Sequence, residues 1–333
     1  MEFKPQSIYY EPKALLYPSA VFLREKYHDV PWIPIENHNN IPHFREQSNK
    51  EFPKMKKNLI VGIRKTHRYT ENHKTSDYLV PYTSSGCTAS CLYCYLVCNY
   101  NKCSYLRLFV NREQMLEKLI AFSKKQEHDL TYEIGSNSDL VLENTITQNL
   151  TWTIENFAKE GKGFLTFPTK FDMVSPILNT NHQGKTIVRM SVNPQEIIQK
   201  VEFGTASLSR RIQAIHLLKE AGYNVGILIA PVILIDNWKE LYSNLLIELA
   251  NQLTEREKNE LWIEIIFMTY SYIHRMINQE AFPNAINLYD KDKMIGRGRG
   301  KYSYSPSARK EAETLFKEMI PKLFKSATIK YIV

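Results

Sequence analysis

The sequence predicts an α/β fold, a partial (β/α)6 barrel of the TIM type, and three observations support this. From residue 78 onward, short apolar runs alternate with longer segments of helical periodicity, the pattern of a parallel sheet covered by helices. Six such units are too few for a closed eight-stranded barrel, which favours an open one. Polar or turn-forming residues accompany the ends of the first five apolar runs, where barrels of this kind carry their active sites.

The expected elements follow from this alternation. The expected strands are residues 78–82, 130–135, 163–167, 186–192, 225–233 and 262–268. The expected helices include residues 112–125, 142–159, 207–222 (closed by Gly222) and 238–252. Prolines interrupt residues 1–60, where we expect a short helix at 20–27 capped by Ser19. Near the end, a helix runs from Pro306 to about Ile320, Pro321 ends or kinks it, and residues 328–333 form a closing strand.

We expect these elements to form one compact unit of three segments. Residues 1–76 form a cover packed on the barrel, residues 77–280 form the barrel itself, and residues 281–333 form a C-terminal hairpin and closing helix. A chain of 333 residues is long enough to bury a sizeable core.

Composition limits the class of protein. The chain is 43% hydrophobic and 23% charged, as soluble globular proteins are, and it contains no run of eighteen apolar residues. No hydrophobic signal segment follows Met1, so we expect a cytoplasmic protein with no membrane partner. The formal net charge of +8 favours a polyanionic partner without locating the surface that binds it.

The five cysteines lie close together in the sequence, whereas a disulfide framework would distribute them, so we expect a reducing compartment. They are Cys87, Cys91, Cys94, Cys98 and Cys103. The first three have the spacing C-x3-C-x2-C, which can hold three irons of a [4Fe–4S] cluster and leave the fourth iron open to a ligand. A zinc site that adds Cys98 is the main alternative, although zinc sites usually pair two C-x2-C knuckles and this stretch has one. Buried apolar cysteines are a third interpretation.

This spacing, with an aromatic residue before the third cysteine, resembles the signature of the radical S-adenosylmethionine (SAM) superfamily. The sequence Tyr93-Cys94-Tyr95-Leu96 and later motifs resemble, more narrowly, the spore photoproduct lyase family. The later motifs are Glu133-x-x-x-x-Ser138-Asp139, Thr169-Lys170-Phe171, Ser191-x-Asn193-Pro194 and Gly226-Ile-Leu-Ile-Ala-Pro231. The resemblance covers most of the chain and implies a partial barrel of the radical SAM kind.

The resemblance also implies the cofactors and the residues that bind them. Cys87, Cys91 and Cys94 would hold the [4Fe–4S] cluster, and SAM would bind its open iron. Ser138, Lys170 and Ser191 would hold the charged end of SAM, and Ala230 would lie near its adenine. A cation at Lys170 suits this role because the carboxylate of SAM needs one. A solvated surface lysine and helix-capping serines are the alternatives.

The activity implied by the resemblance is DNA repair. The enzyme would convert the spore photoproduct, 5-thyminyl-5,6-dihydrothymine, back to two thymines. A 5′-deoxyadenosyl radical would abstract the C6 hydrogen, the methylene bridge would break by β-scission, and a thiol would return a hydrogen atom. The implied partners are UV-damaged double-stranded DNA and an electron donor such as flavodoxin or ferredoxin, in the endospore core or germinating spore.

The sequence departs from the family at the hydrogen donor. Family members carry a cysteine just before Thr-Ser-Asp, where this chain has Ser136-Asn137-Ser138-Asp139. A serine O–H bond is too strong to donate its hydrogen readily, so we expect Cys98 to donate, with Cys103 as the competing thiol. By resemblance, Tyr93 and Tyr95 relay the radical back toward 5′-deoxyadenosine. Aromatic packing around a dry cluster is the alternative role of both tyrosines.

A basic, glycine-rich stretch lies late in the chain. Residues 295–304 alternate glycine with Arg297, Arg299 and Lys301 and then add Tyr302 and Tyr304. We expect a β-hairpin whose cations meet DNA phosphates and whose tyrosines stack on bases, as a similar hairpin in the family implies. A mobile basic surface loop is the alternative. Tyr270, Tyr272, His274 and Arg275 follow the sixth strand as further, unranked candidates for the substrate mouth.

Two other functional classes stay open at this point. One is a radical SAM enzyme that acts on RNA or a peptide. The other is a non-catalytic DNA-binding protein that uses its cysteines for zinc or for an iron–sulfur sensor. The iron content and the brown colour of anaerobically purified protein would separate the iron-free form of the second class from the enzymes.

Overall fold

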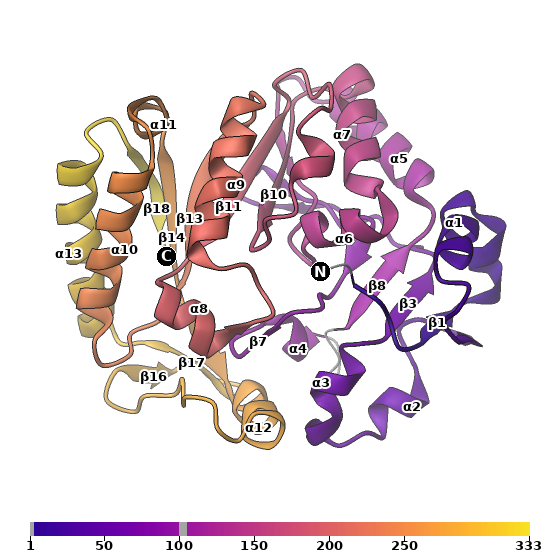
Figure 1. Ribbon diagram of the computed structural model, residues 1–333, viewed down its shortest axis with the longest axis horizontal. Helices are drawn as coiled ribbons and strands as arrows, with labels where there is room; N and C mark the ends of the chain where they lie inside the picture. The colour runs from indigo at the N-terminus through magenta and orange to yellow at the C-terminus, as the bar shows by residue number, and fades with distance from the viewer. Residues whose placement is uncertain (1–2, 100–104) are drawn as a thin grey trace.

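The structure is a computed structural model that describes residues 3–99 and 105–333; the side chains of Cys98 and Asn99 lie outside this description. Its main sheet curls into an open half-barrel (Figure 1), which confirms the predicted fold class. Every pairing in this sheet is parallel except that of its edge strand β4 with β5. In the order of the sheet, the strands are β18 (Thr328–Ile332), β14 (Trp262–Phe267), β13 (Asn224–Val232), β11 (Thr186–Val192), β10 (Phe164–Thr169), β9 (Thr131–Glu133), β5 (Tyr78–Leu79) and β4 (Thr70–Glu71).

Alternate side chains along β11 lie on opposite faces of the sheet, one apolar and one polar. Val188, Met190 and Val192 are buried in the main hydrophobic core. The residues between them point to the inner side, since successive side chains of a strand face opposite ways. There Arg189 pairs with Glu133 at 2.6 Å and Glu264 at 3.4 Å, and Ser191 lines a pocket. The interior of the half-barrel is therefore polar, and the site can form at its open end.

Helices cover the outer face of the half-barrel (Figure 1). The longer ones in the described chain are α5 (Arg112–Lys124), α6 (Leu140–Thr147), α7 (Asn149–Glu160), α9 (Leu208–Glu220), α10 (Trp238–Gln252) and α13 (Pro306–Leu323). Shorter helical segments are α8 (Gln195–Val201), α11 (Glu255–Asn259) and the 3-10 turn Ser175–Ile177. Close packing explains one glycine: a Cβ added to Gly226 on β13 would lie 2.2 Å from the ring of Trp262.

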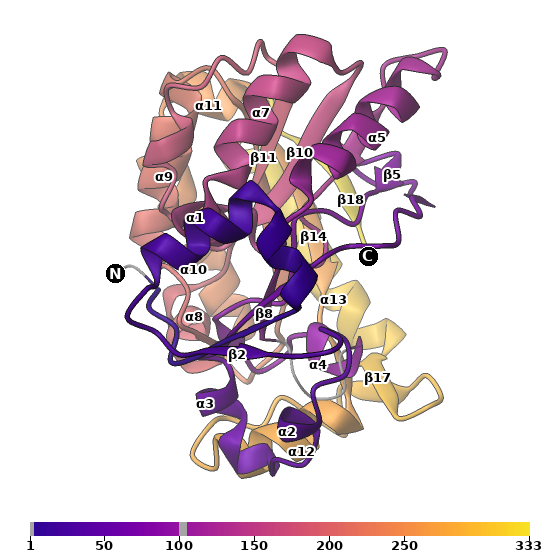
Figure 2. The same cartoon turned by 90° about the vertical axis from the view of Figure 1, so that its right-hand side faces the viewer.

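The N-terminal segment builds a second sheet beside the half-barrel and lies across the face that Figure 2 presents to the viewer. In order, its strands are β2 (Trp32–Pro34), β1 (Ile8–Tyr10), β3 (Leu59–Gly62), β8 (Leu106–Phe109) and β6 (Ser84–Ser85). Its helical segments are the 3-10 turn Pro12–Leu16, α1 (Pro18–Lys26), α2 (Pro42–Arg45), the 3-10 turn Asn49–Glu51 and α3 (Phe52–Met55). Because β6 precedes the cysteines and β8 follows them, the cysteine stretch leaves and re-enters this sheet.

The C-terminal part adds a small antiparallel sheet at the lower edge of the view (Figure 1). Its strand order is β15 (Thr269–Ser271), β17 (Lys301–Tyr304) and β16 (Met294–Gly296), and α12 (Tyr272–Ala281) follows β15 directly. The predicted β-hairpin over residues 295–304 is therefore confirmed. Its tip contains Gly298, Arg299 and Gly300, all with positive φ angles, a conformation that glycine adopts without strain.

Several local predictions differ from the structure. The helix expected over residues 142–159 is two helices, because Gln148 adopts a left-handed conformation (φ 58°) between α6 and α7. Ser19 does not cap α1: this helix begins at Pro18, and Tyr17 is its N-cap residue. Pro321 lies inside α13, which continues to Leu323. The C-terminal cap at Gly222 (φ 84°) is confirmed after α9.

The predicted division into segments 1–76, 77–280 and 281–333 stays a prediction, and strand pairing crosses both of its boundaries. β3 pairs with β8, and β14 pairs with β18. In the described ranges 3–99 and 105–333, no helix is long and apolar enough to span a membrane.

Candidate active site

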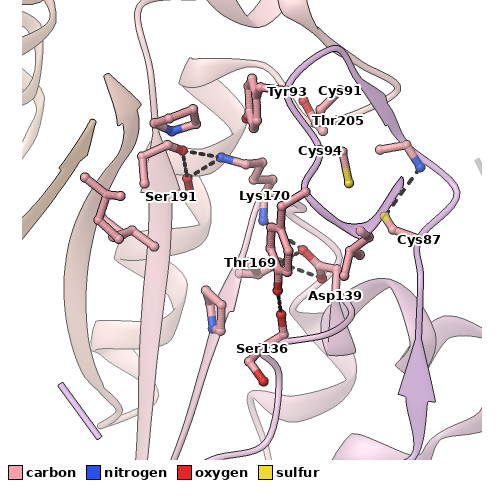
Figure 3. A pocket seen from close by; sticks show the side chains of 18 of the residues that line it. Cys87, Cys91, Tyr93, Cys94, Ser136, Asp139, Thr169, Lys170, Ser191 and Thr205 are labelled. Carbon is pink, nitrogen blue, oxygen red and sulfur yellow. Dashed lines mark hydrogen bonds between the residues drawn. The ribbon is translucent and has the colours of Figure 1, made fainter. Parts of the chain in front are cut away.

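One pocket lies at the carboxyl ends of the barrel strands, and it gathers most of the residues predicted from the sequence (Figure 3). Its volume is about 320 Å³. The predicted residues that line it are Cys87, Cys91, Tyr93, Cys94, Tyr95, Ser138, Lys170, Ser191 and Ala230. They come from the cysteine loop and from the ends of β9, β10, β11 and β13, so the expected meeting of strand ends at one site is confirmed.

The three cysteines of the motif enter the pocket from a loop with little regular structure. Cys91 lies on the short strand β7 (Ser90–Cys91), which pairs with β12 (Glu202–Phe203), and Cys94 precedes α4 (Leu96–Asn99). Burial raises the pKa of Cys87 to about 12 and also raises the pKa of Cys91. Thiols in this surrounding need a bound metal to be thiolates at neutral pH.

Three cysteine sulfurs are available at one pocket. In a [4Fe–4S] cluster each cysteine binds a different iron, and three cysteines leave the fourth iron open to a ligand. The chemistry of three cysteine sulfurs at one pocket therefore fits a [4Fe–4S] cluster.

Lys170 follows β10 and extends across the pocket toward β11 and β13 (Figure 3). Its Nζ atom lies 2.5 Å from Ser191 Oγ and 2.6 Å from the carbonyl oxygen of Ala230. It also lies 3.1 Å from a carboxylate oxygen of Glu202. Lys170, Ser191 and Ala230, three of the four residues predicted at the charged end and adenine of SAM, are thus in direct contact, and the ammonium group is held in one position.

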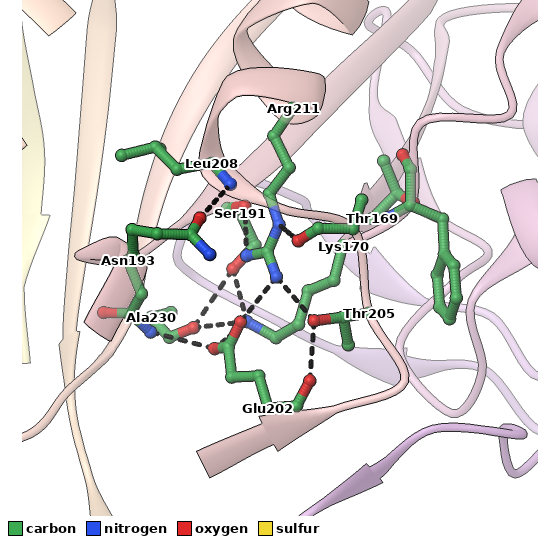
Figure 4. Close-up of polar contacts among 12 residues, drawn as sticks. Thr169, Lys170, Ser191, Asn193, Glu202, Thr205, Leu208, Arg211 and Ala230 are labelled. Carbon is green, nitrogen blue, oxygen red and sulfur yellow. Dashed lines mark hydrogen bonds and ion pairs between the residues drawn. The ribbon is translucent and has the colours of Figure 1, made fainter. Parts of the chain in front are cut away.

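Glu202 is the centre of a buried polar network that the sequence did not reveal (Figure 4). Its carboxylate accepts hydrogen bonds from Arg211 Nη2 at 2.7 Å and from Asn193 Nδ2 at 2.9 Å, besides its contact with Lys170. Burial alone would raise the pKa of Glu202, but the charges of Lys170 and Arg211 lower it to about 2. One carboxylate thus faces two cations, which leaves a net positive charge beside the pocket.

The two predicted relay tyrosines have different environments. The Tyr93 hydroxyl donates to Glu202, and burial raises the pKa of this phenol well above its ordinary value. The Lys170 ammonium also lies 5.7 Å from the centre of the Tyr93 ring. Tyr95 is 50% exposed, and its hydroxyl donates to the carbonyl oxygen of Ser136. Tyr95 therefore contacts the position at which this sequence departs from the family.

Ser138 and its neighbour Asp139 hold the pocket together. Ser138 Oγ donates to the carbonyl oxygen of Gly86 at 2.9 Å and accepts from Ser84 Oγ at 2.8 Å, which joins the cysteine loop to the end of β9. Asp139 caps α6 by accepting from its first backbone amides, and it also accepts from the backbone amide of Lys170 at 2.9 Å. The Ser138 hydroxyl is thus already bonded within the protein, which makes it a structural as well as a pocket-lining residue.

The predicted hydrogen donor cannot be placed at the pocket. The backbone of Cys98 lies in α4, but its side chain is outside the described residues, as is the whole of Cys103. The choice between these two thiols therefore stays a prediction.

The predicted DNA-binding residues divide between the surface and the core. Arg297, Arg299 and Lys301 are exposed at the hairpin tip, and Tyr302 is half-buried against Tyr289. The prediction that Tyr304 stacks on bases is wrong: this residue is 4% exposed, and its hydroxyl accepts from the backbone amide of Leu234 at 2.8 Å. Tyr302 and Tyr304 share one face of β17, and this face packs on the barrel.

Comparison with known proteins agrees with this site. The family model described as "Spore photoproduct lyase" matches residues 3–333. The chain is 30% identical over 338 residues to the spore photoproduct lyase of Bacillus subtilis (strain 168), an alignment that covers 99% of this chain and 98% of that protein. It is also 30% identical over 342 residues to the Clostridium acetobutylicum protein of the same name, with both chains covered completely.

Solved structures show the same relation. A spore photoproduct lyase complexed with dinucleoside spore photoproduct matches with a TM-score of 0.92 and 28% identity, covering 100% of both chains. A double mutant of spore photoproduct lyase with bound AdoMet and the same dinucleoside matches equally well. A more distant structure, anSMEcpe with bound AdoMet, matches 75% of this chain and 60% of its own, with a TM-score of 0.50 and 17% identity, and shares the fold. Because the family model matches residues 3–333 and these relatives align over almost their full length, this chain belongs to the spore photoproduct lyase family.

Proposed function

We propose that this chain is a DNA repair lyase that reverses the spore photoproduct to two thymines and uses AdoMet as its cosubstrate. The observation that carries the proposal is the pocket in which the three cysteines and Lys170 meet, within a chain matched from end to end by the family. Solved relatives hold AdoMet and dinucleoside spore photoproduct. These relationships disfavour the non-catalytic zinc or sensor protein and the enzyme acting on RNA or a peptide.

Different residues of the pocket have different proposed roles. Cys87, Cys91 and Cys94 would hold the [4Fe–4S] cluster, which together with AdoMet supplies a hydrogen-abstracting adenosyl radical. Lys170 binds the carboxylate of AdoMet, because this cation is already oriented and only partly neutralised by Glu202. Ser191 and the Ala230 carbonyl oxygen hold that lysine in place and border the adenosyl part.

The thymine radical left after the crosslink breaks must receive a hydrogen atom. Cys98 is the proposed donor, and Tyr93 and Tyr95 are the proposed relay. The hydroxyl of Tyr95 donates to the carbonyl oxygen of Ser136, the position of the missing family cysteine, so Tyr95 lies beside the place that the family donor occupies. The electron donor, flavodoxin or ferredoxin, and the spore compartment stay predictions.

The exposed tip of the hairpin is the proposed contact with duplex DNA. Arg297, Arg299 and Lys301 bring three cations to phosphates at close range, since the glycines between them carry no side chains. The crosslinked thymines must leave the base stack to enter the pocket, and poor stacking of a damaged pair lowers the energy required.

The direct test is anaerobic incubation of the reconstituted protein with AdoMet, a reductant and a dinucleotide carrying the spore photoproduct. We expect thymine products to appear with little net consumption of AdoMet, measured by chromatography of thymine products and 5′-deoxyadenosine. Formation of 5′-deoxyadenosine without thymine would contradict the proposed substrate but keep the radical chemistry. Reconstituted protein that contains no iron would contradict both the proposed substrate and the radical chemistry.

The variant Lys170→Met should weaken AdoMet binding by about 10- to 100-fold, the effect of losing one charge-assisted contact. Folding should survive, because Glu202 keeps its bond to Arg211. Binding is measured by equilibrium dialysis of the reconstituted protein, with Lys200→Met, an exposed lysine paired with Glu196, as the control. An unchanged dissociation constant would exclude Lys170 from the AdoMet site.

Replacing Arg297, Arg299 and Lys301 together by alanine should reduce the salt dependence of duplex binding. Three lost phosphate contacts correspond to a decrease of about 2–3 in the slope of log K against log salt. Fluorescence anisotropy at several salt concentrations measures this slope. The control replaces the exposed Lys310, Lys317 and Lys322 of α13 by alanine, which removes the same charge elsewhere. Equal slopes for the two triple variants would refute the hairpin interface.

The variant Cys98→Ala should still cleave the crosslink but should lose clean hydrogen return. We expect trapped radical products, such as a sulfinate adduct with added dithionite, in place of thymine, detected by mass spectrometry. Cys103→Ala is the matched control and should give thymine. If the products of the two variants were exchanged, Cys103 would be the donor.

A further inference from the structure

Helix α12 lies against the cysteine loop and contacts two of its carbonyl groups. His274 Nε2 lies 3.1 Å from the carbonyl oxygen of Cys94, and Asn278 Nδ2 donates to the carbonyl oxygen of Leu92 at 2.8 Å. The two carbonyls belong to the same turn of the loop, on either side of Tyr93. Two side chains one helical turn apart therefore hold the segment that presents Cys94 to the pocket.

The hydrogen-bond partners of His274 fix the role of one ring nitrogen. A carbonyl oxygen only accepts hydrogen bonds, so Nε2 carries the hydrogen that it donates to Cys94. The partner of Nδ1 is Ser271 Oγ at 3.0 Å, which also accepts from the backbone amide of His274 and so caps α12. The His274 ring also stacks on the Tyr270 ring, with the ring centres 5.2 Å apart. These contacts hold the His274 ring in one orientation.

The same helix is joined to the proposed DNA hairpin (Figure 1). β15, which leads directly into α12, pairs with β17 so that Tyr270 lies opposite Tyr302 and Ser271 opposite Lys301. The backbone amide of Tyr272 donates to the carbonyl oxygen of Gly300 at 2.8 Å. An unbroken series of backbone and side-chain bonds thus connects the hairpin tip to Cys94.

Among the described residues 91–97, the backbone makes few bonds within the loop, so outside contacts help to hold it. Cys94 N donates to Cys91 O at 3.1 Å, Val97 N donates to Cys94 O at 3.2 Å, and Leu92 N donates outward to Val201 O at 3.0 Å. A segment with so little regular structure opens easily unless side chains hold its backbone groups.

We propose that His274 and Asn278 are positioning residues for the cysteine loop, and that they tie this loop to the hairpin. They fix the carbonyls of Cys94 and Leu92, and with them the direction in which the Cys94 thiolate meets its iron. DNA bound at the hairpin then stabilises the loop through β15 and α12. The inference rests on the proposed function for the cluster and for the DNA contact.

The test compares His274→Leu with His274→Gln in the reconstituted protein. Leucine removes the donor, whereas glutamine retains an N–H group at a similar reach. We expect amide hydrogen exchange in residues 91–97 to be about tenfold faster in the leucine variant, as one lost hydrogen bond predicts, and near normal in the glutamine variant. The electron paramagnetic resonance spectrum of the reduced cluster with AdoMet should change in the leucine variant and be restored by glutamine.

Two further variants make this comparison decisive. His216→Leu, on α9 and paired with Glu257, is the control for losing a histidine away from the loop and should change neither exchange nor spectrum. If His274→Leu does not fold, Asn278→Ala tests the other bond, with Leu92 as the reporting position. Normal exchange in residues 91–97 together with an unchanged spectrum would overturn the proposal.

A short DNA duplex tests the connection to the hairpin. In the unmodified protein we expect the duplex to slow exchange in both residues 294–304 and residues 91–97. In His274→Leu it should slow exchange in residues 294–304 alone, and slowing of both segments would overturn the connection. Slowing of neither segment in the unmodified protein would refute the DNA interface and the connection, while the comparison without DNA would still decide the positioning role.

Discussion

The buried carboxylate of Glu202 holds together parts of the site that come from separate elements. It contacts Arg211 from α9, Lys170 after β10 and Tyr93 from the cysteine loop. Without this charge, two buried cations would face each other with no counter-ion. Removing one partner of a buried ion pair costs about 3–5 kcal/mol of folding stability. The positions of Lys170 and Tyr93 therefore depend on one side chain.

This arrangement also explains how the pocket can receive an anion. A lone buried lysine would lose its proton or attract solvent. A lysine paired one to one with a carboxylate would have little affinity left for a further anion. Here one carboxylate serves two cations, so the Lys170 side chain retains capacity for a further negative group. Because Ser191 and Ala230 already hold it, little conformational entropy is lost when a ligand binds.

The sequence predicts what depends on local patterns and misses what depends on distant contacts. β11 has the boundaries that its β-branched residues indicate, and the three cysteines that the motif singles out meet at one pocket. The break at Gln148 carries neither proline nor glycine, so periodicity alone does not reveal it. Glu202 is a single residue outside any motif, and its partners lie elsewhere in the chain. His274 is an unranked candidate for the substrate mouth in the sequence, whereas the structure shows its contact with the cysteine loop. Tyr304 was misassigned because composition does not say which face of a hairpin packs on the barrel.

The pairing of β6 with β8 sets both ends of the cysteine loop. Ser84 lies opposite Leu108 and Ser85 opposite Arg107, in antiparallel register, so the chain returns to the strand beside the one it left. The entropy of closing this loop is lost when the smaller sheet forms, so binding of the proposed cluster would not have to supply it. Both ends of the cysteine loop would therefore stay in place in a chain that has lost the proposed cluster.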